Sequence, residues 1–295
     1  MSSFVDVSGR VVLRLVGADG LDFIQRISTN DIAALQLGQS KQTILTNEKG
    51  RIIDVVTVHR TAESRLMLLG QSKDSAQLIP WIEKYIIMED IHVEDLTSST
   101  AQYLIYDYKA EDHVRFTSFS SPETIALSEE FGSLRLVRVI SPRELKGSAE
   151  EALSAMDLTH RPVEEFEEFR VTNGIPGALA ELTPQYNPLE ANLGTLISWT
   201  KGCYIGQEVI ARLDTYKKVQ RHLVTMSMSA LPDGLPISFW NTEGEAGVIT
   251  SAATIAETGE IRGIGFLKTS GSDHPETYSF LKDGVKVPLQ IHNIT

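Results

Sequence analysis

From about residue 221 onward the sequence changes character, and this change limits the folds that the chain can adopt. The last quarter consists of short β-rich runs separated by glycine and Asp-Gly turns. Runs of this length and spacing are typical of a small antiparallel structure. The sequence therefore predicts a C-terminal β-barrel or sandwich, with strands near 221–228, 246–255, 261–266 and 285–291.

The first two hundred residues mix strands and helices instead. Residues 10–16 read as a strand, and a short helix with one apolar face follows directly. Two further β-rich runs, 42–45 and 52–59, are joined by a turn that ends in a glycine and therefore read as a hairpin. Because these elements do not alternate strictly as βαβ units, we expect an α+β fold for this part.

The length of 295 residues is close to the size at which one hydrophobic core splits into several, so two or three domains are expected. We predict an α+β region at 1–215 and a β-barrel domain at 216–295. If the first region itself contains two lobes, the split is expected near 110–145.

Composition excludes several classes of protein. Apolar stretches are far shorter than the roughly 18 residues that a membrane span needs, and the N-terminus resembles neither a secretory signal nor a transit peptide. We therefore expect a cytoplasmic protein without membrane contact. The net charge of -12 disfavours stable binding to nucleic acid. A single cysteine excludes an internal disulfide and a zinc ion or cluster held by this chain's cysteines alone, and the histidines show no metal-binding spacing.

That single cysteine, Cys203, lies in a run of twelve residues, KGCYIGQEVIAR, between two glycines and two cations. Residues 207–213 have a helical composition, so Cys203 would precede a helix N-terminus. The partial positive charge there, together with Lys201 and Arg212, would favour a thiolate. Cys203 is then a reactive or ligand-binding sulfur; the alternative is a small apolar side chain buried in a loop.

The run matches the signature K-G-C-[aromatic]-x-G-Q-E-x-x-x-R of the YgfZ family of folate-binding proteins, and the chain thus resembles relatives of the aminomethyltransferase (T-protein) of the glycine cleavage system. The resemblance implies folate-binding lobes around a central channel, followed by a small β-barrel, with Cys203 near the channel mouth. It also implies tetrahydrofolate as cofactor, with Lys201, Tyr204 and Arg212 at its site.

A second segment, 183–193, places Glu190 in an otherwise apolar stretch bounded by prolines. Taken alone, Glu190 reads as a helix-end or surface residue. The segment resembles the L-E-A-G-L stretch of the T-proteins, whose glutamate holds the pterin, and a carboxylate can accept two adjacent pterin N–H groups. The resemblance gives this role to Glu190, and Asn192 replaces the glycine of that stretch.

A third segment, 47–55, is similar to the T-protein stretch G-G-I-I-D-D. Asp54 matches the first aspartate, which would orient folate or move a proton, whereas Val55 replaces the second. Without the resemblance, Asp54 reads equally well as an outward-facing residue on a half-buried strand. Residues 28–31 resemble the early T-x-D turn of the same family, or an ordinary turn after a helix.

These observations leave three functions open. The leading hypothesis is a tetrahydrofolate-binding accessory protein for the assembly or repair of iron-sulfur clusters, which acts on iron-sulfur proteins or assembly factors and indirectly supports tRNA-modifying enzymes. The alternative is a one-carbon transferase or demethylase that uses Cys203 or Asp54 in catalysis. A third is a folate-binding subunit of a larger oxidase. Whether the chain is an enzyme stays open.

Overall fold

The computed structural model describes residues 2–119, 123–269 and 277–294. Its first lobe is an antiparallel five-stranded sheet in the order β3-β4-β5-β2-β6. Apolar side chains of two helices pack on this sheet in one buried cluster, which confirms the predicted strand, helix and hairpin near the N-terminus. The elements are β2 (Val12–Val16), α1 (Gly20–Ile27), β3 (Ser40–Thr46), β4 (Ile52–Ala62), β5 (Arg65–Gly70), α2 (Ser75–Glu83) and β6 (His92–Asp95).

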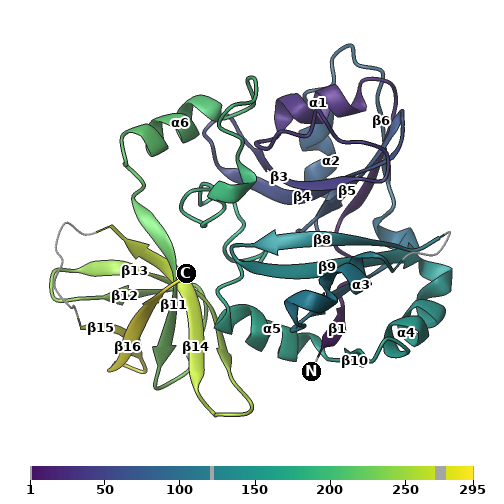
Figure 1. The fold of residues 1–295 in the computed structure, drawn as a ribbon. Helices are drawn as coiled ribbons and strands as arrows, with labels where there is room; N and C mark the ends of the chain where they lie inside the picture. The colour runs from purple at the N-terminus through teal and green to yellow at the C-terminus, as the bar shows by residue number, and fades with distance from the viewer. Residues whose placement is uncertain (1, 120–122, 270–276, 295) are drawn as a thin grey trace.

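The second lobe is also a five-stranded sheet, in the order β10-β1-β7-β9-β8. Two helices pack against it in a separate apolar cluster, and the lobe lies beside the first one (Figure 1). Its elements are β1 (Ser3–Asp6), β7 (Thr100–Tyr106), α3 (His113–Thr117), β8 (Ile125–Phe131), β9 (Leu134–Pro142), α4 (Lys146–Ser154) and β10 (Thr159–His160).

The two lobes are interleaved along the chain. The sheet of the second lobe combines β1 with strands after residue 100, and the whole first lobe is inserted between β1 and β7. A division near 110–145, as the sequence suggested, would cut this sheet apart, because β7 lies before that range, β8 and β9 lie within it, and β10 follows it. The sequence missed the insertion because β1 is only four residues long and pairs with distant strands.

A buried polar cluster joins the two sheets. Glu129 on β8 and Arg138 on β9 form an ion pair of 2.8 Å, and both side chains are fully buried. Thr57 of the first lobe donates a hydrogen bond to Glu129 (3.1 Å), and Arg138 donates to the carbonyl of Gly70 (2.8 Å). Because a buried charge needs its partners, this network fixes one arrangement of the lobes.

The C-terminal part is a closed six-stranded antiparallel barrel in the order β11-β14-β13-β12-β15-β16. The predicted α+β fold with a C-terminal barrel is therefore confirmed. β8, β12 and β15 were not expected, since they are short or carry several polar residues. We propose residue 216 as the domain boundary. The strands are β11 (Arg221–Met228), β12 (Ile237–Trp240), β13 (Glu245–Thr254), β14 (Ile261–Lys268), β15 (Tyr278–Lys282) and β16 (Val285–Asn293).

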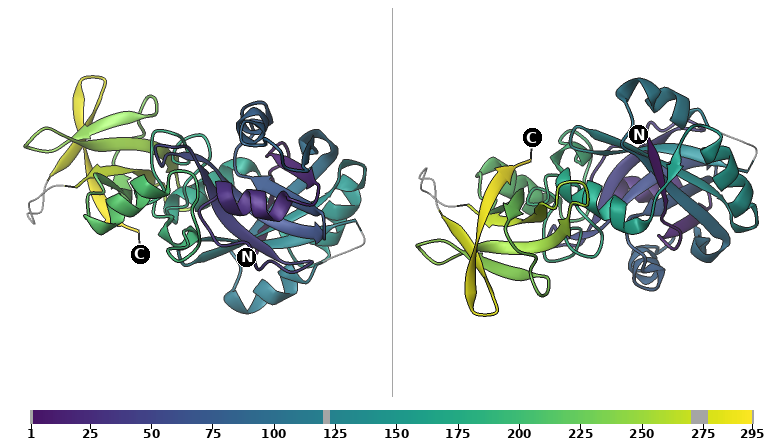
Figure 2. Two further views of the ribbon diagram at one scale, coloured as in Figure 1. Left: turned by 90° about the horizontal axis from the view of Figure 1, so that it is seen from above. Right: turned by 90° about the horizontal axis from the view of Figure 1, so that it is seen from below.

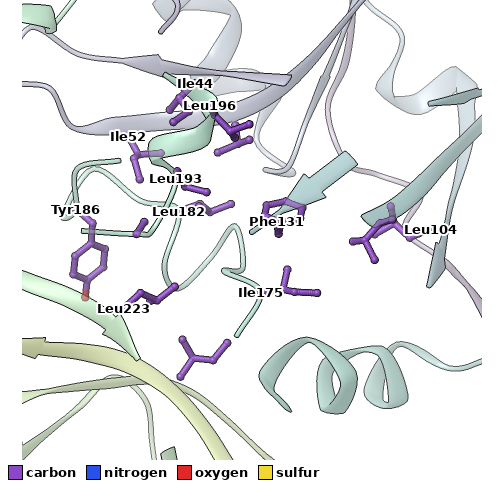
Figure 3. Close-up of a cluster of buried hydrophobic side chains, with 14 of the residues drawn as sticks. Ile44, Ile52, Leu104, Phe131, Ile175, Leu182, Tyr186, Leu193, Leu196 and Leu223 are labelled. Carbon is purple, nitrogen blue, oxygen red and sulfur yellow. The ribbon is translucent and has the colours of Figure 1, made fainter. Parts of the chain in front are cut away.

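Both lobes and the barrel meet at one apolar cluster (Figure 3). It combines Ile44 and Ile52 from the first lobe, Leu104 and Phe131 from the second, and Leu223 from the barrel. The barrel lies at one end of the molecule and the lobes at the other (Figure 2). The remaining helices are α5 (Val163–Thr172), α6 (Gln207–Thr215) and the short 3-10 turns η1 (Thr97–Ser99), η2 (Ala110–Asp112), η3 (Arg143–Leu145) and η4 (Gly194–Leu196).

Candidate functional site

Lys201 ties the cysteine loop to the end of α1. Its ammonium group donates hydrogen bonds to the carbonyls of Gln25 (2.5 Å), Ser28 (2.7 Å) and Asn30 (2.8 Å). A cation at the C-terminal end of a helix satisfies carbonyls that lack intrahelical partners. Burial lowers the pKa of Lys201 to about 8, although the Asp31 carboxylate partly opposes this shift. Lys201 therefore anchors the loop with all three of its N–H donors.

Gly206 presses the other end of the loop against the β3–β4 turn. Its φ angle is +82°, and a Cβ atom there would lie 2.6 Å from the Asn47 carbonyl oxygen and 2.9 Å from the Gly50 Cα. Only glycine fits such a left-handed, close approach. Thr46 adds a hydrogen bond of 2.6 Å to the Ile205 carbonyl. The loop is thus attached to the first lobe on both sides of its cysteine.

Cys203 itself is exposed to solvent. The interpretation of this cysteine as a small buried packing residue is therefore wrong. The next side chain, Tyr204, is buried in the central cluster, and burial raises its pKa to about 12. α6 begins at Gln207, as the sequence predicted, and Arg212 is exposed on it. A Cβ atom at the neighbouring Gly202 would meet no atom within 4 Å.

Asp54 lies in the opposite kind of environment. Its side chain is 1% exposed, and it accepts hydrogen bonds from the backbone N–H groups of Val55 (2.8 Å), Gln71 (3.1 Å) and Ser72 (3.2 Å). Burial raises its pKa to about 6, although these hydrogen bonds act in the other direction. The outward-facing interpretation is wrong: Asp54 joins β4 to the chain that follows β5.

Glu190 is also buried, at 2% exposure, so its interpretation as a surface residue is wrong. Its carboxylate accepts the Asn187 N–H (3.0 Å) and forms ion pairs with Arg51 (3.2 Å) and Arg221 (3.4 Å). Its own carbonyl accepts the N–H of Leu223 on β11 (2.9 Å). Glu190 thus connects the first lobe to the start of the barrel.

Asn192 has a structural explanation. Its φ angle is +57°, a left-handed conformation that asparagine tolerates better than most residues. Its side chain is exposed and lies 3.5 Å from the Leu223 carbonyl. A glycine in the similar T-protein stretch would adopt the same conformation easily, which accounts for the replacement.

The segments that the sequence singled out meet at one turn. Gly50 of the β3–β4 turn contacts α6 and Gly206, and the neighbouring Arg51 pairs with Glu190. Asp54 lies on β4, three residues after Arg51, with its oxygens directed at the chain after β5. The turn therefore links the Cys203 loop with Glu190, whereas Asp54 has separate surroundings.

Sequence reasoning missed the charged residues around α5. Arg170 is buried and pairs with Glu181 (3.1 Å) and Glu167 (2.8 Å). The i,i+3 spacing of Glu167 and Arg170 was the available signal. Among the described residues there is no group of three or more histidine, cysteine or acidic side chains placed to hold a metal ion.

Comparison with known proteins agrees with this architecture. Residues 2–118 match the family model of the GCVT N-terminal domain. The aminomethyltransferase T of the glycine cleavage system from Bartonella henselae superposes with a TM-score of 0.82 over 99% of this chain and 85% of that one, at 18% sequence identity. The chain has the aminomethyltransferase-type fold. No helix of the described residues is long and apolar enough to cross a membrane.

Two relatives carry different names. A chloroplastic protein of Arabidopsis thaliana, provisionally named a transferase, is 26% identical over 95% of this chain and 68% of its own length. A mitochondrial protein of Dictyostelium discoideum, named a homologue of the iron-sulfur cluster assembly factor IBA57, is 23% identical over 76% of this chain and 62% of its own length. Relatives that match this chain in sequence are thus named both for group transfer and for cluster assembly.

Proposed function

We propose that the chain is a tetrahydrofolate-binding accessory protein of the YgfZ type for the assembly or repair of iron-sulfur clusters. It would act in the cytoplasm on iron-sulfur proteins or assembly factors, and would indirectly support tRNA-modifying enzymes that carry clusters. Its fold is that of an aminomethyltransferase of the glycine cleavage system, and relatives named as cluster assembly factors match about three quarters of the chain.

The exposed Cys203 carries this proposal. Lys201 and Gly206 hold its loop from both sides, yet the sulfur stays accessible to solvent. A fixed, accessible thiol suits contact with a partner protein, because docking does not have to order the loop first. One cysteine cannot hold a cluster alone, so any cluster would need further ligands from the partner.

Glu190 is the residue that would hold the pterin ring of the folate. Its buried carboxylate fits this role in charge, since a pterin presents two adjacent N–H donors. The same carboxylate already pairs with Arg51 and Arg221, so the pterin would share it with both arginines. When bound, tetrahydrofolate could accept or donate a one-carbon group. Lys201, by contrast, would act through the loop that it anchors.

Calorimetry with tetrahydrofolate tests this assignment. We expect micromolar binding, and Glu190→Ala should weaken it by about 1.5–3 kcal/mol because a charge-assisted hydrogen-bonding partner is lost. Glu164→Ala, on the solvated side of α5, is the matched control and should bind as the wild type does. An unchanged dissociation constant for Glu190→Ala would remove this residue from the folate site.

The second candidate is a one-carbon transferase, and the buried Asp54 favours it. A carboxyl group with a pKa raised to about 6 can exchange a proton near neutral pH. Both of its oxygens face backbone N–H groups, however, and Val55 occupies the neighbouring position. We therefore expect no turnover of an aminomethyl-lipoyl carrier protein with tetrahydrofolate. Multiple turnovers that Asp54→Ala abolishes would establish the transferase instead.

A further inference from the structure

The chain between α2 and β6 exposes two adjacent apolar side chains. Ile87 is 84% exposed and Met88 is 93% exposed. The two residues before them, Tyr85 and Ile86, pack against the buried cluster of the first lobe, so the segment passes from the core to the surface within two residues. In Figure 1 this chain rises beside α1 to the top of the view. We call Ile87 and Met88 the apolar tip.

Glu89 holds the apolar tip in one conformation. Its carboxylate accepts hydrogen bonds from both backbone N–H groups of the tip (2.7 and 3.1 Å) and forms an ion pair with Arg26 of α1 (2.8 Å). The hydrogen bond from the Ile87 N–H and the contact with Arg26 lower the pKa of Glu89 to about 2, so this carboxylate is ionised at neutral pH. Asp90 then donates its N–H to the Asp19 carboxylate (2.8 Å). The tip therefore does not have to become ordered when it binds a partner.

The apolar tip and the cysteine loop are held by the same two elements. On α1, Arg26 binds the carboxylate that fixes the tip, and the carbonyl of the preceding Gln25 accepts a hydrogen bond from Lys201 (2.5 Å). In the β3–β4 turn, Glu48 accepts a hydrogen bond from the Tyr85 hydroxyl (2.6 Å), and the same turn contacts the glycine at the far end of the cysteine loop. The tip and the loop therefore keep fixed positions relative to each other on the first lobe.

The surface around the apolar tip is acidic. Residues 19–26 and 83–90 together contain five acidic residues and two basic ones, a net charge of -3. Both basic residues, Arg26 and Lys84, already form ion pairs with carboxylates of this chain. The acidic residues exposed here are Asp19, Asp22, Glu83 and Asp90. An apolar projection with an acidic surround is complementary to an apolar recess with a basic rim.

We propose that the apolar tip docks into an apolar recess with a basic rim on the protein that Cys203 contacts. This inference rests on the proposed function and adds the surface by which the partner is recognised. Apolar anchors, methionine among them, are enriched at the centres of protein interfaces, where a polar rim surrounds them. A second copy of this chain fits less well, because a two-fold contact would bring two acidic surfaces together. An anionic membrane would be repelled for the same reason.

Photocrosslinking from two positions of the full chain identifies the occupant. A benzophenone amino acid in place of Met88, and a benzophenone maleimide attached to Cys203, the single cysteine, should label the same protein in a lysate of the source cells. Labelling from position 88 should decrease as salt is added, because opposite charges attract across the contact. The benzophenone amino acid in place of Val114, which is 71% exposed on α3, is the control and should not label this protein. Labelling of different proteins from the two positions, or labelling from position 88 only of a second copy or of lipid, would overturn the inference.

Substitutions in the apolar tip test its role in cells. Ile87→Ser together with Met88→Ser should leave the melting temperature unchanged, because both side chains are exposed. In a strain that lacks the gene, this double variant should restore about tenfold less activity of iron-sulfur enzymes than the wild type, since an interface anchor is lost. The matched control, Val114→Ser together with Leu281→Ser, removes two exposed apolar side chains elsewhere and should restore full activity. Met88→Leu keeps an apolar side chain of similar size and should also restore full activity.

The two experiments distinguish failure of the docking surface from failure of the proposed function. If the double serine variant restores full activity and Cys203→Ser does not, the docking inference is wrong and the proposed function stands. If Cys203→Ser restores full activity as well, the proposed function is wrong. The crosslinks then decide the docking inference by themselves, because they ask only whether position 88 and Cys203 reach the same protein.

Discussion

Cys203 and Asp54 are the two side chains that the sequence nominates for catalysis, and the fold places them in opposite environments. Cys203 is exposed on a loop that is held at both ends. Asp54 is 1% exposed, and three backbone N–H groups occupy its oxygens. The comparison shows that similarity in sequence does not by itself distinguish an exposed side chain from a buried one. Of these two residues, only Cys203 is accessible to solvent.

The largest expected effect is a difference in unfolding free energy between substitutions at the two glycines that flank this cysteine. Gly206→Ala would place a Cβ atom 2.6 Å from the Asn47 carbonyl at a φ of +82°, so we expect a loss of about 3 kcal/mol in unfolding free energy. Gly202→Ala is the matched control. Its Cβ meets no atom within 4 Å, and the change should stay below about 0.5 kcal/mol. Denaturant unfolding measures both; equal stabilities would show that Gly206 does not anchor the loop.

A smaller effect is expected in how the unfolding free energy depends on pH, through the carboxyl group of Asp54. Its pKa is about 6 in the folded state against 3.8 in the unfolded chain, so the stability that it contributes is present below pH 4 and is lost as pH rises through 6. Relative to Asp54→Asn, the wild type should therefore lose about 2–3 kcal/mol between pH 4 and pH 7. Parallel stability curves for the two proteins over this range would show that Asp54 is not a desolvated carboxyl group.

Much of the fold was predictable because its signals are local. Hydrophobic periodicity identified α1 and the β3–β4 hairpin, and the change in texture near Arg221 identified the barrel. The insertion of the first lobe between β1 and β7 was not predictable, because it depends on pairing between strands about a hundred residues apart. Sequence patterns do not encode such pairing directly.

The site was predictable only in part for the same reason. The sequence placed Cys203 before α6, but it could not show that Lys201 would bind carbonyls about 175 residues earlier in the chain. It gave Glu190 a role without showing its arginine partners, Arg51 and Arg221, which come from two distant segments.

The most direct test of the account compares stability and function in one variant, Cys203→Ser. The substitution changes one exposed atom, so the unfolding free energy should change by less than about 1 kcal/mol. In a strain that lacks the gene, the wild-type chain should restore the activity of iron-sulfur enzymes, and Cys203→Ser should not, although it is folded and equally abundant. Full restoration by Cys203→Ser would contradict the central claim that this exposed sulfur performs the function of the protein.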